Sequence, residues 1–152
     1  MRSRADPTAR ALAAVVVRLV LGLVFAAAGW WKVFSLGAAV HARTLFVEPY
    51  ADTFLPMWSL WVAGTTVPFV ELAGGALLLL GWKRLLASVG LGGVLILVTF
   101  GHLLHEPIFD FSAHVVPRTL LLAIMLALHG DDRWSLDACL ERRRRSASAT
   151  TR

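Results

Sequence analysis

Four long apolar stretches constrain the fold of this chain more than any other feature of its sequence. They cover Ala11–Phe34, Trp58–Trp82, Leu85–His105 and Val115–His129. A helix needs about 20 apolar residues to cross the ~30 Å hydrocarbon layer of a bilayer; the first three stretches meet that length and the fourth meets its lower end. The pattern predicts an all-α, polytopic membrane protein built as a bundle of four transmembrane helices.

The composition agrees with a lipid environment. Hydrophobic residues make up 57% of the chain and charged residues 16%, and the mean hydropathy is +0.67. Soluble domains carry about 25% charged residues. A chain of 152 residues has room for one small bundle. We expect an N-terminal tail at residues 1–10, the helical membrane domain at residues 11–138, and a basic, disordered tail at residues 139–152.

The net charge of +5 raises the question of a nucleic-acid partner. The positive residues, however, gather mainly in the two tails and one turn: Arg2, Arg4 and Arg10, then Lys83 and Arg84, then Arg142–Arg145. If the helices alternate in direction, all three groups fall on one side of the membrane, which the positive-inside rule identifies as cytoplasmic. We therefore expect both termini in the cytoplasm and no nucleic-acid partner.

The longest connection, Ser35–Met57, lies outside the cytoplasm on this topology. It is too polar to span a membrane and too rich in aromatic side chains to be an inert linker. We expect a short amphipathic or re-entrant element that lies on the bundle, because backbone at membrane depth has to be shielded by protein.

Charged residues inside the spans are informative because each is costly in lipid unless it is paired or faces an internal cavity. In the first span one stripe recurs at spacings of three and four and so faces the bundle; it contains Arg18, Gly22, Phe25, Gly29 and Lys32. The second span repeats the pattern with Gly64, Pro68, Glu71, Gly75 and Leu78. The glycines of these stripes, with Gly74, permit close helix packing.

The two stripes predict a buried ion pair between Arg18 and Glu71. At 1.5 Å per residue, Arg18 lies ~10 Å above the cytoplasmic start of its helix and Glu71 lies ~16 Å above the cytoplasmic end of its own. A long arginine side chain can bridge that difference. Two interpretations stay open: the pair is a structural clamp, or it belongs to a proton or quinone site.

A second polar cluster is predicted at the outer end of the third span, where His102 and His105 share one helix face. Lys32 of the first span and Arg118 at the start of the fourth lie at a similar depth. Two imidazoles beside two fixed cations could bind a quinone head group and exchange protons with it.

Other interpretations of these histidines stay open. They could be hydrogen-bonding residues at a helix end, or they could bind a metal ion together with Glu106 and His114, since imidazole and carboxylate suit Zn, Cu or Fe. The sequence contains no Ser-His-Asp order, no HExxH and no phosphate-binding glycine loop. Cys139 is the single cysteine, so thiol exchange cannot be this chain's own chemistry.

Three segments resemble the DoxX family of small four-helix membrane proteins. They are VVRLVLGLVFAAAGWWKV (Val16–Val33), VELAGGALLLLGWKR (Val70–Arg84) and LLLAIMLALHGDDRWSLDA (Leu120–Ala138). The most specific elements are an Arg and a G-x-x-K at the two ends of the first span and E-x-x-G-G in the second. Carried over to this sequence, the family pattern marks Arg18, Gly29, Lys32, Glu71, Gly74, Gly75 and Arg84.

The resemblance implies a four-helix bundle in the cytoplasmic membrane of a bacterium or archaeon. Some family members resemble subunits of membrane redox assemblies, including thiosulfate:quinone oxidoreductase and a complex with superoxide dismutase and a sulfurtransferase. Relatives resemble factors for the maturation of methylamine dehydrogenase. The resemblance therefore implies a protein partner in a membrane redox assembly, with the substrate chemistry on that partner.

Taken together, the sequence patterns and the resemblance imply an integral membrane subunit of a redox complex that is non-catalytic or interacts with quinone. Two alternatives from other classes stay open. The first is a small transporter or channel, whose path the same charges would line. The second is a ligand-free scaffold for a partner oxidoreductase, in which the polar residues only fix the helix register.

Overall fold

The computed structural model describes residues 6–106, 108 and 110–150, and all regular structure in this part of the chain is helical. Seven α-helices and two π-helical segments follow one another: α1 Pro7–Trp30, a π-helix at Trp31–Gly37, α2 Ala38–Ala42, a π-helix at Arg43–Val47, α3 Glu48–Tyr50, α4 Met57–Leu80, α5 Arg84–His105, α6 Val115–Ala127 and α7 Leu136–Thr150. The predicted all-helical fold is confirmed for the described residues.

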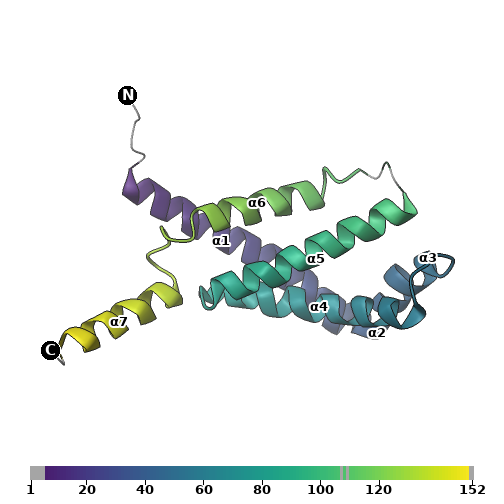
Figure 1. The fold of residues 1–152 in the computed structure, drawn as a ribbon, viewed down its shortest axis with the longest axis horizontal. Helices are drawn as coiled ribbons and strands as arrows, with labels where there is room; N and C mark the ends of the chain where they lie inside the picture. Colours follow the sequence, from purple (N-terminus) through teal and green to yellow (C-terminus); the bar gives the residue numbers. More distant parts are fainter. Residues whose placement is uncertain (1–5, 107, 109, 151–152) are drawn as a thin grey trace.

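Helices α1, α4, α5 and α6 pack around a shared core (Figure 1). Helix α1 contacts α4 and α6, and α5 contacts the same two helices from the other side. The core contains side chains from all four helices, among them Phe25, Leu78, Leu91 and Met125. Each helix therefore buries one apolar stripe against its neighbours, as expected for a small bundle.

In the part of the chain that the structure describes, three helical segments are long and apolar enough to cross a membrane: Pro7–Tyr50, Met57–Leu80 and Arg84–His105. Their outer faces are apolar as well, since Leu86, Val89 and Ile96 of α5 are all more than 60% exposed. A continuous apolar exterior of this kind fits contact with lipid rather than water.

Helix α6 is shorter than the sequence predicts for a fourth span. The apolar stretch reaches His129, but the helix ends at Ala127 and the chain then turns. Its 13 residues give a length of ~20 Å, well below the ~30 Å of a hydrocarbon layer. The structure thus provides three helices of spanning length and a fourth, shorter apolar helix packed beside them.

Residues 35–57, which the sequence predicts as a connection lying on the bundle, continue the first helical segment as far as Tyr50 and pack against α4. Gly37 has φ +88°, a left-handed conformation that favours glycine, and it separates α2 from the preceding π-helix. Helix α2 and the π-helix after it pack against α4. At Gly64 of α4 an added Cβ would lie 2.6 Å from the Cα of Ala42, so the two backbones are in close contact.

Glycines also bring α1 and α4 together. A Cβ at Gly29 would lie 2.3 Å from the backbone nitrogen of Leu72, and one at Gly75 would lie 2.3 Å from that of Ala26. Gly22 faces the carbonyl oxygen of Gly75 in the same contact. Of the other predicted packing residues, Gly74 instead faces α5, where its Cβ would meet Leu91 at 2.8 Å.

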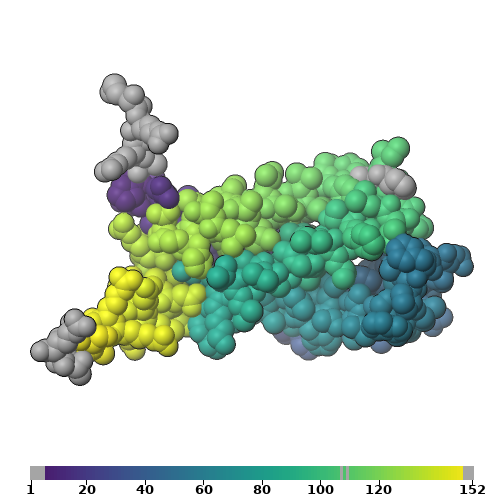
Figure 2. All heavy atoms as spheres, in the orientation of Figure 1, coloured from purple at the N-terminus to yellow at the C-terminus, as the bar shows by residue number. Residues whose placement is uncertain are grey.

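The C-terminal segment is helical where the sequence predicts a disordered tail. Helix α7 extends from one end of the bundle (Figure 2). Its first turn is held because Asp137 accepts hydrogen bonds from the backbone nitrogens of Lys83 and Arg84, at 2.8 and 3.1 Å. An i,i+4 ion pair between Glu141 and Arg145 supports the next turns. Residues 1–5 and 151–152 of the predicted tails, with Arg2 and Arg4, lie outside the described residues.

Replacing Gly29 by alanine should destabilise the bundle. The added methyl group cannot fit beside the Leu72 backbone unless α1 moves away from α4, and overpacking of this kind costs about 1–3 kcal/mol. Gly93→Ala is the matched control, because its Cβ would meet nothing within 4 Å and alanine is the better helix former by ~1 kcal/mol. Thermal unfolding in detergent should give a lower Tm for Gly29→Ala only. Equal Tm values would contradict the close α1–α4 contact.

Candidate functional site

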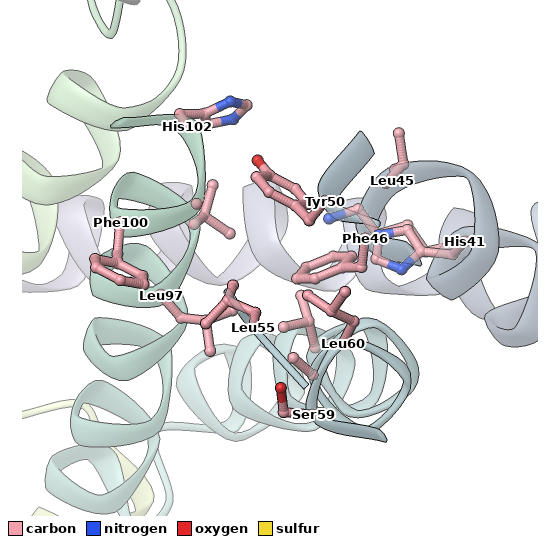
Figure 3. Close-up of a pocket in the computed structure, with 15 residues that line it drawn as sticks. His41, Leu45, Phe46, Tyr50, Leu55, Ser59, Leu60, Leu97, Phe100 and His102 are labelled. Atoms are coloured by element: carbon pink, nitrogen blue, oxygen red, sulfur yellow. The ribbon is translucent and has the colours of Figure 1, made fainter. Parts of the chain in front are cut away.

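A cavity of about 430 Å³ lies at the end of the bundle opposite α7, between α4, α5 and the helical connection that contains α2 and α3 (Figure 3). Its wall is largely apolar, with Phe46, Leu60 and Leu97 among the lining side chains. The polar residues that line it are Lys32, His41, Tyr50, Ser59 and His102. A mainly apolar cavity with a few polar groups is the usual form of a small-molecule site.

The Lys32 ammonium is paired with Glu71 beside this cavity. Lys32 Nζ lies 2.6 Å from Glu71 Oε2, and the side chains are 21% and 3% exposed respectively. Lys32 comes from the π-helix that follows α1, and Glu71 comes from the middle of α4. The carboxylate is therefore inside the protein, while part of the lysine side chain reaches the cavity.

The structure corrects the predicted Arg18–Glu71 ion pair. Arg18 Nε bonds to Asp132 Oδ2 at 2.7 Å, and its Nη1 donates to the carbonyl oxygens of Leu78 and Leu79 at 2.7 and 2.9 Å. Those carbonyls lie seven and eight residues beyond Glu71 on α4, which is ~11 Å along a helix. Arg18 thus stays at the α7 end of the bundle, where a carboxylate is closer than Glu71.

Asp132 joins Arg18 to the turn between α4 and α5. The same Oδ2 atom accepts from Arg84 Nη1 at 3.1 Å, and Arg84 Nε lies 3.3 Å from Asp137. Arg18, Arg84 and Asp132 are each less than 10% exposed in their side chains. Asp132 was not predicted as a site residue, although the acidic pair Asp131-Asp132 after the last apolar stretch is a usable signal for a partner of the buried arginines.

The pKa of Asp137, which lies outside the spans, reflects its contacts with this cluster. Partial burial alone would raise its pKa, but hydrogen bonds from the backbone nitrogens of Arg84 and Lys83, and from the Arg84 guanidinium, lower the pKa of that carboxyl below its ordinary value. Asp137 therefore stays ionised and ties α7 to the α4–α5 turn. The geometry of the whole cluster is that of a clamp between segments far apart in the sequence.

His41 and Tyr50 line the cavity but were not predicted as site residues. His41 is 2% exposed, and its Nδ1 lies 2.8 Å from the carbonyl oxygen of Gly64. Tyr50 follows at the end of the same helical connection, and Figure 3 shows its hydroxyl directed toward His102. A Cβ at Gly101 would lie 3.2 Å from that hydroxyl oxygen, so this glycine lets the phenol approach α5. The polar, aromatic character of residues 35–57 was the available signal.

The four predicted pocket residues are only partly brought together. Lys32 and His102 line the cavity, and the His102 ring contacts Phe111 at 6.2 Å between centroids. His105 lies just outside, with its ring edge-on to Tyr50 at 6.0 Å. Arg118 does not line the cavity: its guanidinium carbon lies 5.8 Å from the centre of the Phe25 ring. A cation–π contact inside the bundle accounts for that placement.

The metal alternative finds no support in the geometry. Among the described residues, no three His, Cys, Asp or Glu side chains form a group that could hold a metal ion. The four predicted ligands, His102, His105, Glu106 and His114, are all described residues, and they do not form such a group.

The polar groups at the border of the cavity have both donor and acceptor capacity. A lysine ammonium and a tyrosine hydroxyl are hydrogen-bond donors, and imidazole nitrogens can donate or accept. The remaining wall excludes water and favours an apolar body. Such a lining can hold a small ligand by hydrogen bonds at the border and by apolar contact with the wall.

Comparison with known proteins gives one match. The family model described as DoxX matches residues 13–104, which is more than half of the 152 residues. No curated protein and no solved structure matches the chain. The matched range contains the Lys32–Glu71 pair and every residue that lines the cavity.

Asp132→Asn should unfold the protein far more readily than Asp131→Asn. The first change removes the carboxylate shared by two buried guanidinium groups, and breaking a buried pair costs about 3–5 kcal/mol. Asp131 pairs with the half-exposed Arg10, and surface pairs are worth about 0–1 kcal/mol. Denaturant unfolding in detergent compares the two variants. Similar losses of stability in both would contradict the clamp.

Proposed function

Because the chain belongs to the DoxX family, we propose that it is an integral membrane subunit of a redox complex that binds a quinone head group in the cavity beside Lys32. The observation that carries this proposal is the cavity itself, a space of about 430 Å³ with apolar walls and the side chains of Lys32, Tyr50 and His102 at its border. Small-molecule sites typically occupy about 300–1,000 Å³.

The positive charge of Lys32 in the Lys32–Glu71 pair suits a ligand that becomes more negative during the reaction. Reduction of a quinone generates anionic oxygen atoms, which a nearby ammonium stabilises. Glu71 holds the ammonium at 2.6 Å, so its position is fixed before the ligand arrives. A partner protein carries the substrate chemistry, because the only thiol, Cys139, lies on α7 at the opposite end of the bundle.

The length of α6 and the positions of the basic residues support a membrane topology for this subunit. Helix α6 is the fourth span, completed by the turn residues that follow it or by local thinning of the bilayer. The end with Arg10, Lys83 and the arginine run of α7 faces the cytoplasm of a bacterium or archaeon, as the positive-inside rule requires. Both termini then lie inside the cell, and the cavity lies toward the outer face.

The binding test uses variants of the cavity border. Tyr50→Phe and His102→Ala each remove one polar group from the wall. A hydrogen bond contributes about 0.5–1.5 kcal/mol, so each variant should raise the Kd for quinone by up to roughly tenfold. His114→Ala is the control, because this histidine does not line the cavity. Equilibrium titration in nanodiscs, with bound quinone extracted and quantified, gives the Kd.

Two results would overturn the proposal. The first is no quinone binding by the parent protein, which would favour the ligand-free scaffold. The second is equal affinity in the parent, the cavity variants and the control. Ion or solute flux through liposomes containing only this chain would favour the transporter alternative.

A further inference from the structure

A second hollow of about 300 Å³ adjoins the cavity between α4 and α5. Four residues line both spaces: Ser59, Ala63, Val67 and Leu97. The second hollow is lined almost wholly by apolar atoms, and we call it the α4–α5 groove. The two spaces therefore lie next to each other along α4 and α5.

The α4–α5 groove opens on the exposed side of two membrane-spanning helices. Trp58 and Val62 of α4 border it and are 70% and 57% exposed. Both helices are long and apolar enough to cross a membrane. The opening therefore faces the hydrocarbon region sideways, where a lipid-soluble molecule is already dissolved.

Gly93 keeps the α5 side of the groove open. It lines the groove, and a Cβ built there would meet nothing within 4 Å. This glycine differs from Gly74, where an added Cβ would meet Leu91 at 2.8 Å. Helix packing accounts for Gly74, whereas at Gly93 the absent side chain leaves empty space.

We propose that the α4–α5 groove holds the isoprenoid tail of the quinone and is the lateral path by which the head group enters the cavity. This inference rests on the proposed function, because it assigns the tail of the same ligand. The commitment to an apolar chain follows from the apolar lining, the four residues shared with the cavity and the exposed border at Trp58 and Val62.

The groove provides space for the tail and adds little binding free energy of its own. An isoprenoid tail gains little hydrophobic free energy on moving from lipid to protein, since both surroundings are apolar. Filling the groove should therefore exclude a tailed quinone by steric overlap and leave a tailless quinone unaffected. That difference separates the groove from the head-group site.

The experiment compares two ligands in two groove variants. Gly93→Leu fills the groove from α5, and Thr66→Phe fills it from α4; neither residue lines the cavity. Gly130→Leu is the matched control, since a Cβ there also meets nothing within 4 Å and the residue lies outside both spaces. The ligands are a benzoquinone with a long isoprenoid tail and the same head group with a methyl in place of the tail.

Both groove variants should raise the Kd of the tailed quinone by about tenfold or more and leave the Kd of the tailless quinone within about twofold of the parent. Unchanged binding of the tailed quinone in both variants would overturn the groove while the proposed function stands. An equal loss of both ligands in both variants would also overturn it. Absence of binding in the parent protein would instead mark failure of the proposed function.

Discussion

The ion pair between Lys32 and Glu71 is the constraint on which the candidate binding site depends. Two charges held at 2.6 Å inside segments of spanning length are tolerated only if they neutralise each other and face the protein interior. That requirement fixes the rotation of α1 and α4, and the glycines at Gly29 and Gly75 let the two backbones approach closely enough to meet it. The lysine then reaches the cavity from a fixed position.

The polar residues divide between the two ends of the bundle. At the α7 end, Arg18, Arg84 and Asp132 form a dense cluster in which one carboxylate oxygen accepts bonds from two guanidinium groups. Such a cluster favours one arrangement of the helices, because each charge needs its partner. At the other end, the helical connection before α4 bends over α4 and α5 and encloses a cavity. We therefore assign the structural role to the first cluster and the binding role to the second.

Hydrophobic pattern and spacing predicted the helices well, because a span and its buried stripe are local properties of the sequence. They did not predict the ionic partners. Buried stripes and helix depth predict that Arg18 pairs with Glu71, yet Asp132 approaches Arg18 only after the turn that follows α6. Tyr50 and His41 were missed for a similar reason: the left-handed turn at Gly37 sets where the connection packs. Arg118 was assigned to the pocket by depth, whereas its rotation about α6 directs it to Phe25.

The most direct measurement of the central claim is quinone affinity in the double variant Lys32→Met with Glu71→Leu. Replacing a buried ion pair by apolar side chains of similar volume is often neutral for stability, so the variant should fold with a Tm near that of the parent. Its Kd for quinone should rise by about tenfold or more, because a hydrogen bond from a charged group contributes about 1.5–3 kcal/mol. A folded double variant that binds quinone as tightly as the parent would contradict the account.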